Sequence, residues 1–89
     1  MIWEAHTDPA MHTILRLPAV KAAIGLARST LYLRVEKGTF PKPVNLGARA
    51  VGWPAREVYA INAARIAGKS DREIRSLVDS IHDARKVLE

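Results

Sequence analysis

The chain has 89 residues, of which 48% are hydrophobic, and it contains no cysteine. This length allows one small domain with a modest core, and the lack of cysteine excludes a disulfide framework and a thiolate metal site. No apolar run is long enough to span a membrane, and residues 1–13 lack the basic and apolar regions of a secretory signal. We therefore expect a soluble, cytoplasmic protein.

The net charge of +5 is concentrated in the middle of the chain. Residues 14–69 carry ten basic and two acidic residues, a net charge of +8, whereas residues 1–13 and 70–89 carry −2 and −1. Clustered Lys and Arg side chains bind polyanions because each phosphate contact releases counterions. Charge alone leaves two interpretations open, a nucleic-acid partner and a merely solvated basic surface.

The first half of the chain predicts two short helices. Residues 1–13 show no helical or strand periodicity and are expected to form a flexible arm. A short extended run at 14–17 leads into Pro18, which suits the first turn of a helix that Gly25 ends. The second helix covers residues 28–37. Two short helices joined by a tight, glycine-containing turn are typical of a helix-turn-helix.

The pattern changes after the second helix. Two prolines exclude helix from residues 39–43, and β-prone runs at 44–46 and 50–53 flank a glycine-containing turn, which predicts a β-hairpin, or wing. An isolated hairpin is barely stable in water. We therefore expect Phe40 and Trp53 to pack the wing against the helices.

Two further helices are predicted in the last third of the chain. One begins at Pro54 and runs to Gly68. The other begins at a capping box formed by Ser70 and Glu73. Its apolar stripe either completes the core or forms a homodimer contact, and its near-neutral surface predicts no DNA contact. The stripe consists of Ile74, Leu77, Val78 and Ile81, and Leu88 follows at helical spacing.

No pattern indicates catalysis or metal binding. His6, His12 and His82 lack a second ligand at metal spacing, and the glycines fall at the ends of elements and not in a phosphate-binding loop. Ser29 and Thr30 have no evident general base that would make their hydroxyl groups nucleophiles. We expect a protein that is not an enzyme and that uses no metal, cofactor or small-molecule substrate.

The basic residues fit a DNA interface once they are placed on the predicted elements. In a helix-turn-helix, the N-terminal end of the second helix lies nearest the base edges. There Arg28 suits a guanine, and Ser29 and Thr30 suit base edges or phosphates. Tyr32 either offers its hydroxyl to a phosphate or packs on the wing. Arg34 and Lys37, farther along the helix, are expected either to contact phosphates or to be plain solvated charges. Lys42 and Arg49 on the wing can reach the phosphate backbone or the minor groove.

These residues also carry a resemblance. The segments "RLPAV", "GLARSTLY", "GTFPKPVNLGARAVGW" and the "EV" at 57–58 resemble the AlpA-type family of prophage regulators over about residues 14–67. The resemblance implies a MerR-like or excisionase-like winged helix-turn-helix that binds DNA and regulates transcription. It places Arg28, Ser29, Thr30 and Tyr32 on the recognition helix and Arg49 in the wing. Two positions depart from the family: Ala27 replaces the usual serine, and Leu33-Arg34 stands where an arginine often follows the tyrosine directly.

The predicted fold is mostly α with a small wing. It comprises an arm (1–13), a winged helix-turn-helix domain (14–68) and an amphipathic helix (69–89). The expected function is sequence-specific binding of double-stranded DNA in transcription regulation, with helix 28–37 in the major groove and wing 42–53 on the flank. Two alternatives remain, an excisionase-like factor that bends attachment-site DNA and an adaptor whose basic face binds an acidic protein.

Overall fold

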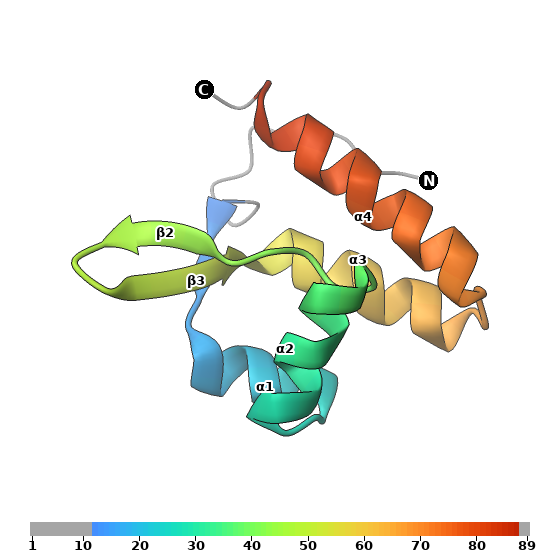
Figure 1. Cartoon of the computed structure of the whole chain (residues 1–89), viewed down its shortest axis with the longest axis horizontal. Coiled ribbons are helices and arrows are strands. Elements are labelled where there is room, and N and C mark those ends of the chain that lie inside the picture. The colour runs from blue at the N-terminus through green and yellow to red at the C-terminus, as the bar shows by residue number, and fades with distance from the viewer. Residues whose placement is uncertain (1–11, 88–89) are drawn as a thin grey trace.

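A computed structural model describes residues 12–87, which form four helices and a small antiparallel sheet (Figure 1). The predicted class, mostly α with a hairpin wing, is confirmed, and the arrangement is that of a winged helix-turn-helix. Of the predicted arm, residues 1–11 lie outside the described part of the chain. The elements in chain order are β1 (Ile14–Leu15), α1 (Leu17–Ile24), α2 (Arg28–Lys37), β2 (Val44–Gly47), β3 (Ala50–Pro54), α3 (Ala55–Ile66) and α4 (Asp71–Arg85).

The middle strand of the sheet is β3, which pairs with β2 on one side and with β1 on the other. In the hairpin Val44 lies opposite Gly52, and across the other edge Leu15 lies opposite Trp53. The extended run before α1 is therefore a third strand. A side chain at Gly52 would not fit, because its Cβ would lie 2.5 Å from Cγ2 of Ile14.

The turn between α1 and α2 contains a glycine that ends the first helix and an alanine at the N-cap of the second. Gly25 has a left-handed φ of 69° and donates its N–H to the carbonyl of Lys21 at 2.8 Å, which ends α1. Ala27 is the N-cap of α2 and has the extended backbone of a capping residue, with φ −73° and ψ 160°. Its methyl group cannot accept a hydrogen bond from the first turn.

The core gathers side chains from all four helices around Trp53. This residue is fully buried, and its ring meets Phe40 edge-on with 6.2 Å between the ring centroids. The predicted contact of Phe40 and Trp53 with the helices is confirmed. The buried cluster consists of Val20, Leu31, Phe40, Trp53, Val58, Ile61, Ile74, Val78 and Ile81.

The last helix begins at the predicted capping box. Oγ of Ser70 accepts the N–H of Glu73 at 3.1 Å, and the Glu73 carboxylate accepts the N–H of Ser70 at 2.8 Å. The hydrogen bonds from Ser70, first from its backbone and then from its side chain, lower the pKa of Glu73 because they favour the carboxylate.

The apolar stripe of α4 packs inside the chain's own core. Ile74, Val78 and Ile81 are each at most 2% exposed. The core alternative therefore holds for these three side chains, which have no free surface for a homodimer contact. A homodimer through this helix stays a prediction. Leu77 is half-buried and borders a shallow apolar groove between α3 and α4.

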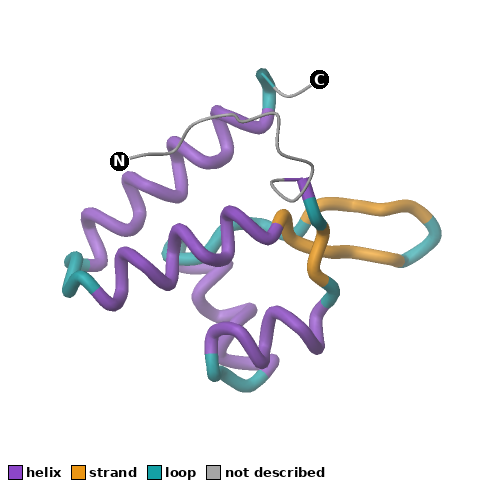
Figure 2. The backbone as a smooth tube through the Cα atoms, turned by 180° about the vertical axis from the view of Figure 1, so that it is seen from behind, coloured by secondary structure: helices purple, strands orange, loops and turns teal. Residues whose placement is uncertain are grey.

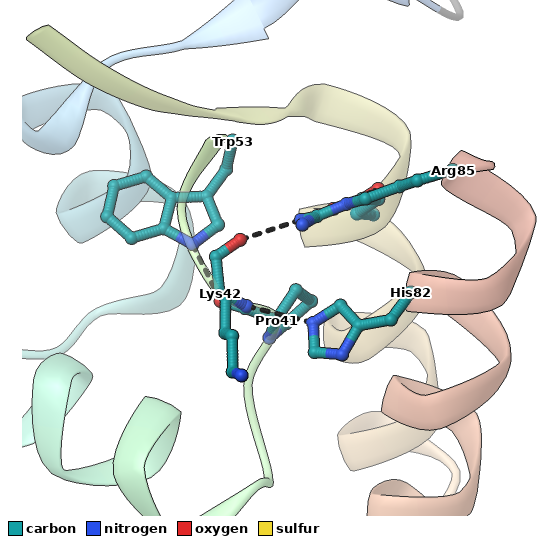
Figure 3. A network of polar contacts seen from close by, with 6 residues as sticks. Pro41, Lys42, Trp53, His82 and Arg85 are labelled. Atoms are coloured by element: carbon teal, nitrogen blue, oxygen red, sulfur yellow. Dashed lines mark hydrogen bonds and ion pairs between the residues drawn. The ribbon is translucent and has the colours of Figure 1, made fainter. Parts of the chain in front are cut away.

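Side chains from β3 and α4 bind the backbone that leads into the wing (Figure 3). Nε1 of Trp53 donates to the carbonyl of Pro41 at 2.8 Å. The N–H of Lys42 donates to Nε2 of His82 at 3.1 Å, and Nη2 of Arg85 donates to the Lys42 carbonyl at 2.7 Å. The chain before β2 is thereby fixed between the sheet and the last helix.

Arg85 also neutralises the buried carboxylate of α3. Glu57 is 1% exposed, and its two oxygens accept from Nε of Arg85 at 2.9 Å and from Nη2 at 2.6 Å. A bidentate pair of this kind fixes the relative orientation of two elements as well as balancing charge. It joins α3 to α4 at the end where both face the wing.

The missing cap at Ala27 gives a stability prediction. Ala27→Ser supplies a hydroxyl to the first turn of α2, and we expect the free energy of unfolding to rise by about 0.5–1 kcal/mol. Urea denaturation followed by circular dichroism measures this change. The matched control is Ala22→Ser, which adds the same hydroxyl to the exposed interior of α1 and should lower stability by a few tenths of a kcal/mol. An unchanged or lower midpoint for Ala27→Ser would contradict the prediction.

The bond between His82 and Lys42 predicts a fall in stability at acid pH. Burial, and next the charge of Arg85, lower the pKa of His82 below its ordinary value of about 6.5. As pH falls, the imidazole becomes protonated at a lower pH in the folded than in the unfolded chain. Its contribution to the free energy of unfolding is therefore complete above about pH 6.5 and is lost as pH falls through the lower, folded-state pKa. Thermal melts of the wild type and of His82→Gln between about pH 7.5 and 5 measure the difference. The melting temperature of the wild type should fall more steeply, and parallel curves would refute the prediction.

Candidate nucleic-acid interface

The outer face of α2 is centred on a row of three exposed side chains. Ser29, Leu33 and Lys37 follow one another at intervals of four residues, so they lie along one side of the helix. On the opposite side, Leu31 is fully buried and Val35 packs against the core. The core thus presents the row outward.

Leu33 is an exposed residue of α2 that the sequence pattern did not single out as a candidate contact. It is 46% exposed in the middle of the row. An apolar side chain on a helix in the major groove suits the methyl group of thymine. Its spacing of four residues from Ser29 was the available signal.

Arg28 and Tyr32 form a second feature at the edge of the same helix. The guanidinium carbon of Arg28 lies 5.4 Å from the centroid of the Tyr32 ring, in cation–π geometry. Tyr32 in turn packs edge-on against Trp53, with 6.1 Å between centroids. Of the two roles considered for Tyr32, the contact with the wing is therefore present. The stacked tyrosine supports an exposed arginine at the first residue of α2.

Thr30 and Arg34 lie on the other edge of α2. Both are half-buried, and both border a hollow between α2 and the α3–α4 turn. The structure therefore separates the predicted residues of α2 into an outward row, the Arg28–Tyr32 edge and this opposite edge.

The wing places Arg49 at its tip and Lys42 at its base. The two-residue turn holds Ala48 and Arg49 at positive φ, 30° and 69°. This conformation is the one that a tight β-hairpin turn needs, although glycine or asparagine adopts it more readily. Both basic side chains are exposed. They lie at opposite ends of β2, so they would contact different points of a bound polymer.

A further cation, Arg16, lies beside the wing and was not predicted as a site residue. It is exposed, and its Nε donates to the carbonyl of Val51 at 2.9 Å. This hydrogen bond holds the N-cap of α1 to β3. The signal was weak, because Arg16 stands in the short run before Pro18 and not in either recognition element.

Two other kinds of site were looked for in the part of the chain that the structure describes, a metal site and a membrane-spanning helix. Residues 12–87 contain no group of three His, Asp or Glu side chains placed to hold a metal ion. His82 binds Lys42, and His6 lies outside the described residues. Within the same range, no helix has the length and apolar content needed to cross a bilayer.

Comparison with known proteins finds relatives with similar sequences. The chain is 45% identical over 62 residues to "Uncharacterized protein ORF88" of Enterobacteria phage P4, a match that covers 70% of each chain. It is 43% identical over 51 residues to "DNA-binding transcriptional activator AlpA" of Escherichia coli strain K12, covering 51% of this chain and 73% of that protein. No solved structure gives a significant match.

A family match covers the same region. Residues 13–61 match the family described as "Prophage CP4-57 regulatory protein (AlpA)". That range is more than half of the chain and contains β1, both helices of the helix-turn-helix, the whole wing and the first half of α3. The resemblance seen in the sequence motifs is confirmed, and the chain belongs to the AlpA family of prophage regulatory proteins.

Proposed function

We propose that this protein is a sequence-specific DNA-binding transcription regulator that inserts α2 into the major groove of a duplex and places the wing on the flank. The observation that carries the proposal is the exposed first turn of α2, where Arg28 rests on Tyr32 beside the outward row. The relative that is named a DNA-binding transcriptional activator supports the same function. The place of action would be the cytoplasm, where phage and bacterial DNA lies.

The residues divide into two kinds of contact. Arg28 is suited to donate two hydrogen bonds to a guanine, and Ser29 lies beside it for a base edge or a phosphate. Lys37, Lys42 and Arg49 carry point charges suited to phosphates, which fix orientation without reading sequence. Recognition thus requires the α2 face and the wing together, because one short helix reads few bases.

Selection of bound sequences from a random duplex library tests this function directly. Enrichment of one motif by the wild type is expected. Arg28→Ala should relax the preference at one base pair, with a loss of about 1–3 kcal/mol of discrimination. Lys37→Ala is the matched control on the same helix and should weaken binding about equally for all sequences. Absence of duplex binding at low salt would refute the proposal in favour of an adaptor.

Genome-wide protection mapping separates regulation from recombination. Sites near promoters would support a transcription regulator. Tandem sites beside an integrase attachment site would instead support an excisionase-like factor. Both functions use the same fold, so the position of the sites is the distinguishing observation.

Arg49 gives a second prediction, on the wing. Arg49→Asn removes the charge and keeps a residue that tolerates the left-handed conformation of the turn. We expect weaker binding to all duplexes, with the slope of log affinity against log salt smaller by about 0.9. Ala48→Asn keeps the charge in the same turn and should leave the slope unchanged. Equal slopes for the wild type and Arg49→Asn would exclude a phosphate contact at the wing tip.

A further inference from the structure

A basic hollow lies between α2 and the turn that joins α3 to α4. It has a volume of about 320 Å³ and is open to solvent. Four cationic side chains and one carboxylate line it, so its net charge is +3. Its lining consists of Thr30, Leu33, Arg34, Lys37, Thr39, Arg65, Asp71 and Arg75. We call this feature the α2–α4 hollow.

The one carboxylate neutralises only one of the cations. Asp71 accepts a hydrogen bond from Nη1 of Arg65 at 3.0 Å. Among residues 12–87, no ion pair is formed by Arg34, Lys37 or Arg75. The hollow therefore holds an excess of positive charge.

Arg75 lies against Gly38, the glycine that ends α2. A Cβ at Gly38 would lie 3.6 Å from Cγ and 3.7 Å from Cδ of Arg75, so the aliphatic part of this side chain runs along the glycine. Arg75 is exposed and projects from α4, a helix for which the sequence predicted no DNA contact. The fold brings it to the C-terminal end of α2.

The hollow is continuous with the outward row of α2. Leu33 and Lys37 belong to both. In Figure 1 and, from behind, in Figure 2, the wing and the α3–α4 turn lie at opposite ends of the molecule with α2 between them. A helix in the major groove has a phosphate backbone on either side. The wing serves one side, and the hollow is placed for the other.

We infer that the α2–α4 hollow binds a backbone phosphate of the DNA on the side of α2 opposite the wing, with Arg75 and Lys37 as its principal donors. This inference rests on the proposed function. A phosphate there would satisfy the unpaired charge, because guanidinium and ammonium groups form strong, charge-assisted hydrogen bonds with phosphate oxygens. It would also extend the DNA contact to α4.

A purely structural role is the competing explanation for the same cations. Positive side chains near the C-terminal end of α2 also offset its helix dipole. Loss of such a role would lower the melting temperature and leave the salt dependence of binding unchanged. Loss of a phosphate contact would leave the melting temperature unchanged and reduce the salt dependence of binding.

The test compares Arg75→Gln with Arg72→Gln in the full chain. Arg72 is an exposed residue of the same helix that does not line the hollow. Both variants lose one charge at nearly the same place, so long-range attraction falls alike in both. Binding to the selected duplex is measured against salt. We expect the slope of log affinity against log salt to fall by about 0.9 for Arg75→Gln and by less than half of that for Arg72→Gln.

A second arm locates the phosphate. Single phosphates of the duplex are replaced by neutral methylphosphonates and affinity is measured for the wild type and Arg75→Gln. We expect a position, on the strand away from the wing, where the replacement weakens the wild type and has no effect on the variant. Equal slopes for the two variants, with no such position, would overturn the inference and leave the proposed function intact. Failure of the wild type to bind any duplex would overturn both.

Discussion

The arrangement of the candidate interface depends on how the backbone at Pro41 and Lys42 is held. Prolines on both sides of Lys42 remove two N–H groups and prevent this segment from joining a helix or a sheet ladder. Its remaining polar groups need partners from elsewhere. Three side chains provide them: Trp53 from β3 and His82 and Arg85 from α4 (Figure 3). The direction in which the wing leaves the core is thus set by hydrogen bonds and not by regular secondary structure.

The same anchor relates the wing to α2. Trp53 donates to Pro41 and packs edge-on against Tyr32, on which Arg28 rests. One buried aromatic residue therefore connects the wing base with the cation at the start of α2. The last helix completes the anchor although it lies beyond residues 13–61, the range that matches the family. Helix α4, which lies outside the range that matches the family, thereby positions the wing, which lies inside it.

Local rules predicted the elements, and long-range contacts explain what was missed. Gly25 and the Ser70–Glu73 box end or begin helices through bonds between near neighbours, so the sequence was sufficient there. The pair of His82 with Lys42 spans 40 residues and leaves no periodic signal. Arg75 was missed for the same reason, since its place beside Gly38 exists only after α4 folds back on α3. The residue pattern of one helix shows which of its faces is apolar and which is polar. It does not show which residues of other elements contact those faces.

The pair of the buried Glu57 and the half-buried Arg85 shows why such anchors are polar. Burying two charges costs much of what their attraction returns, so an apolar pair of similar volume often gives equal or greater stability. An apolar pair would not bind the Lys42 carbonyl, which Nη2 of Arg85 reaches at 2.7 Å while the same nitrogen binds Glu57. Directional bonds fix an angle that apolar packing leaves adjustable. In a domain with so small a core, the charge of Glu57 is best understood as orienting Arg85, and through it the wing.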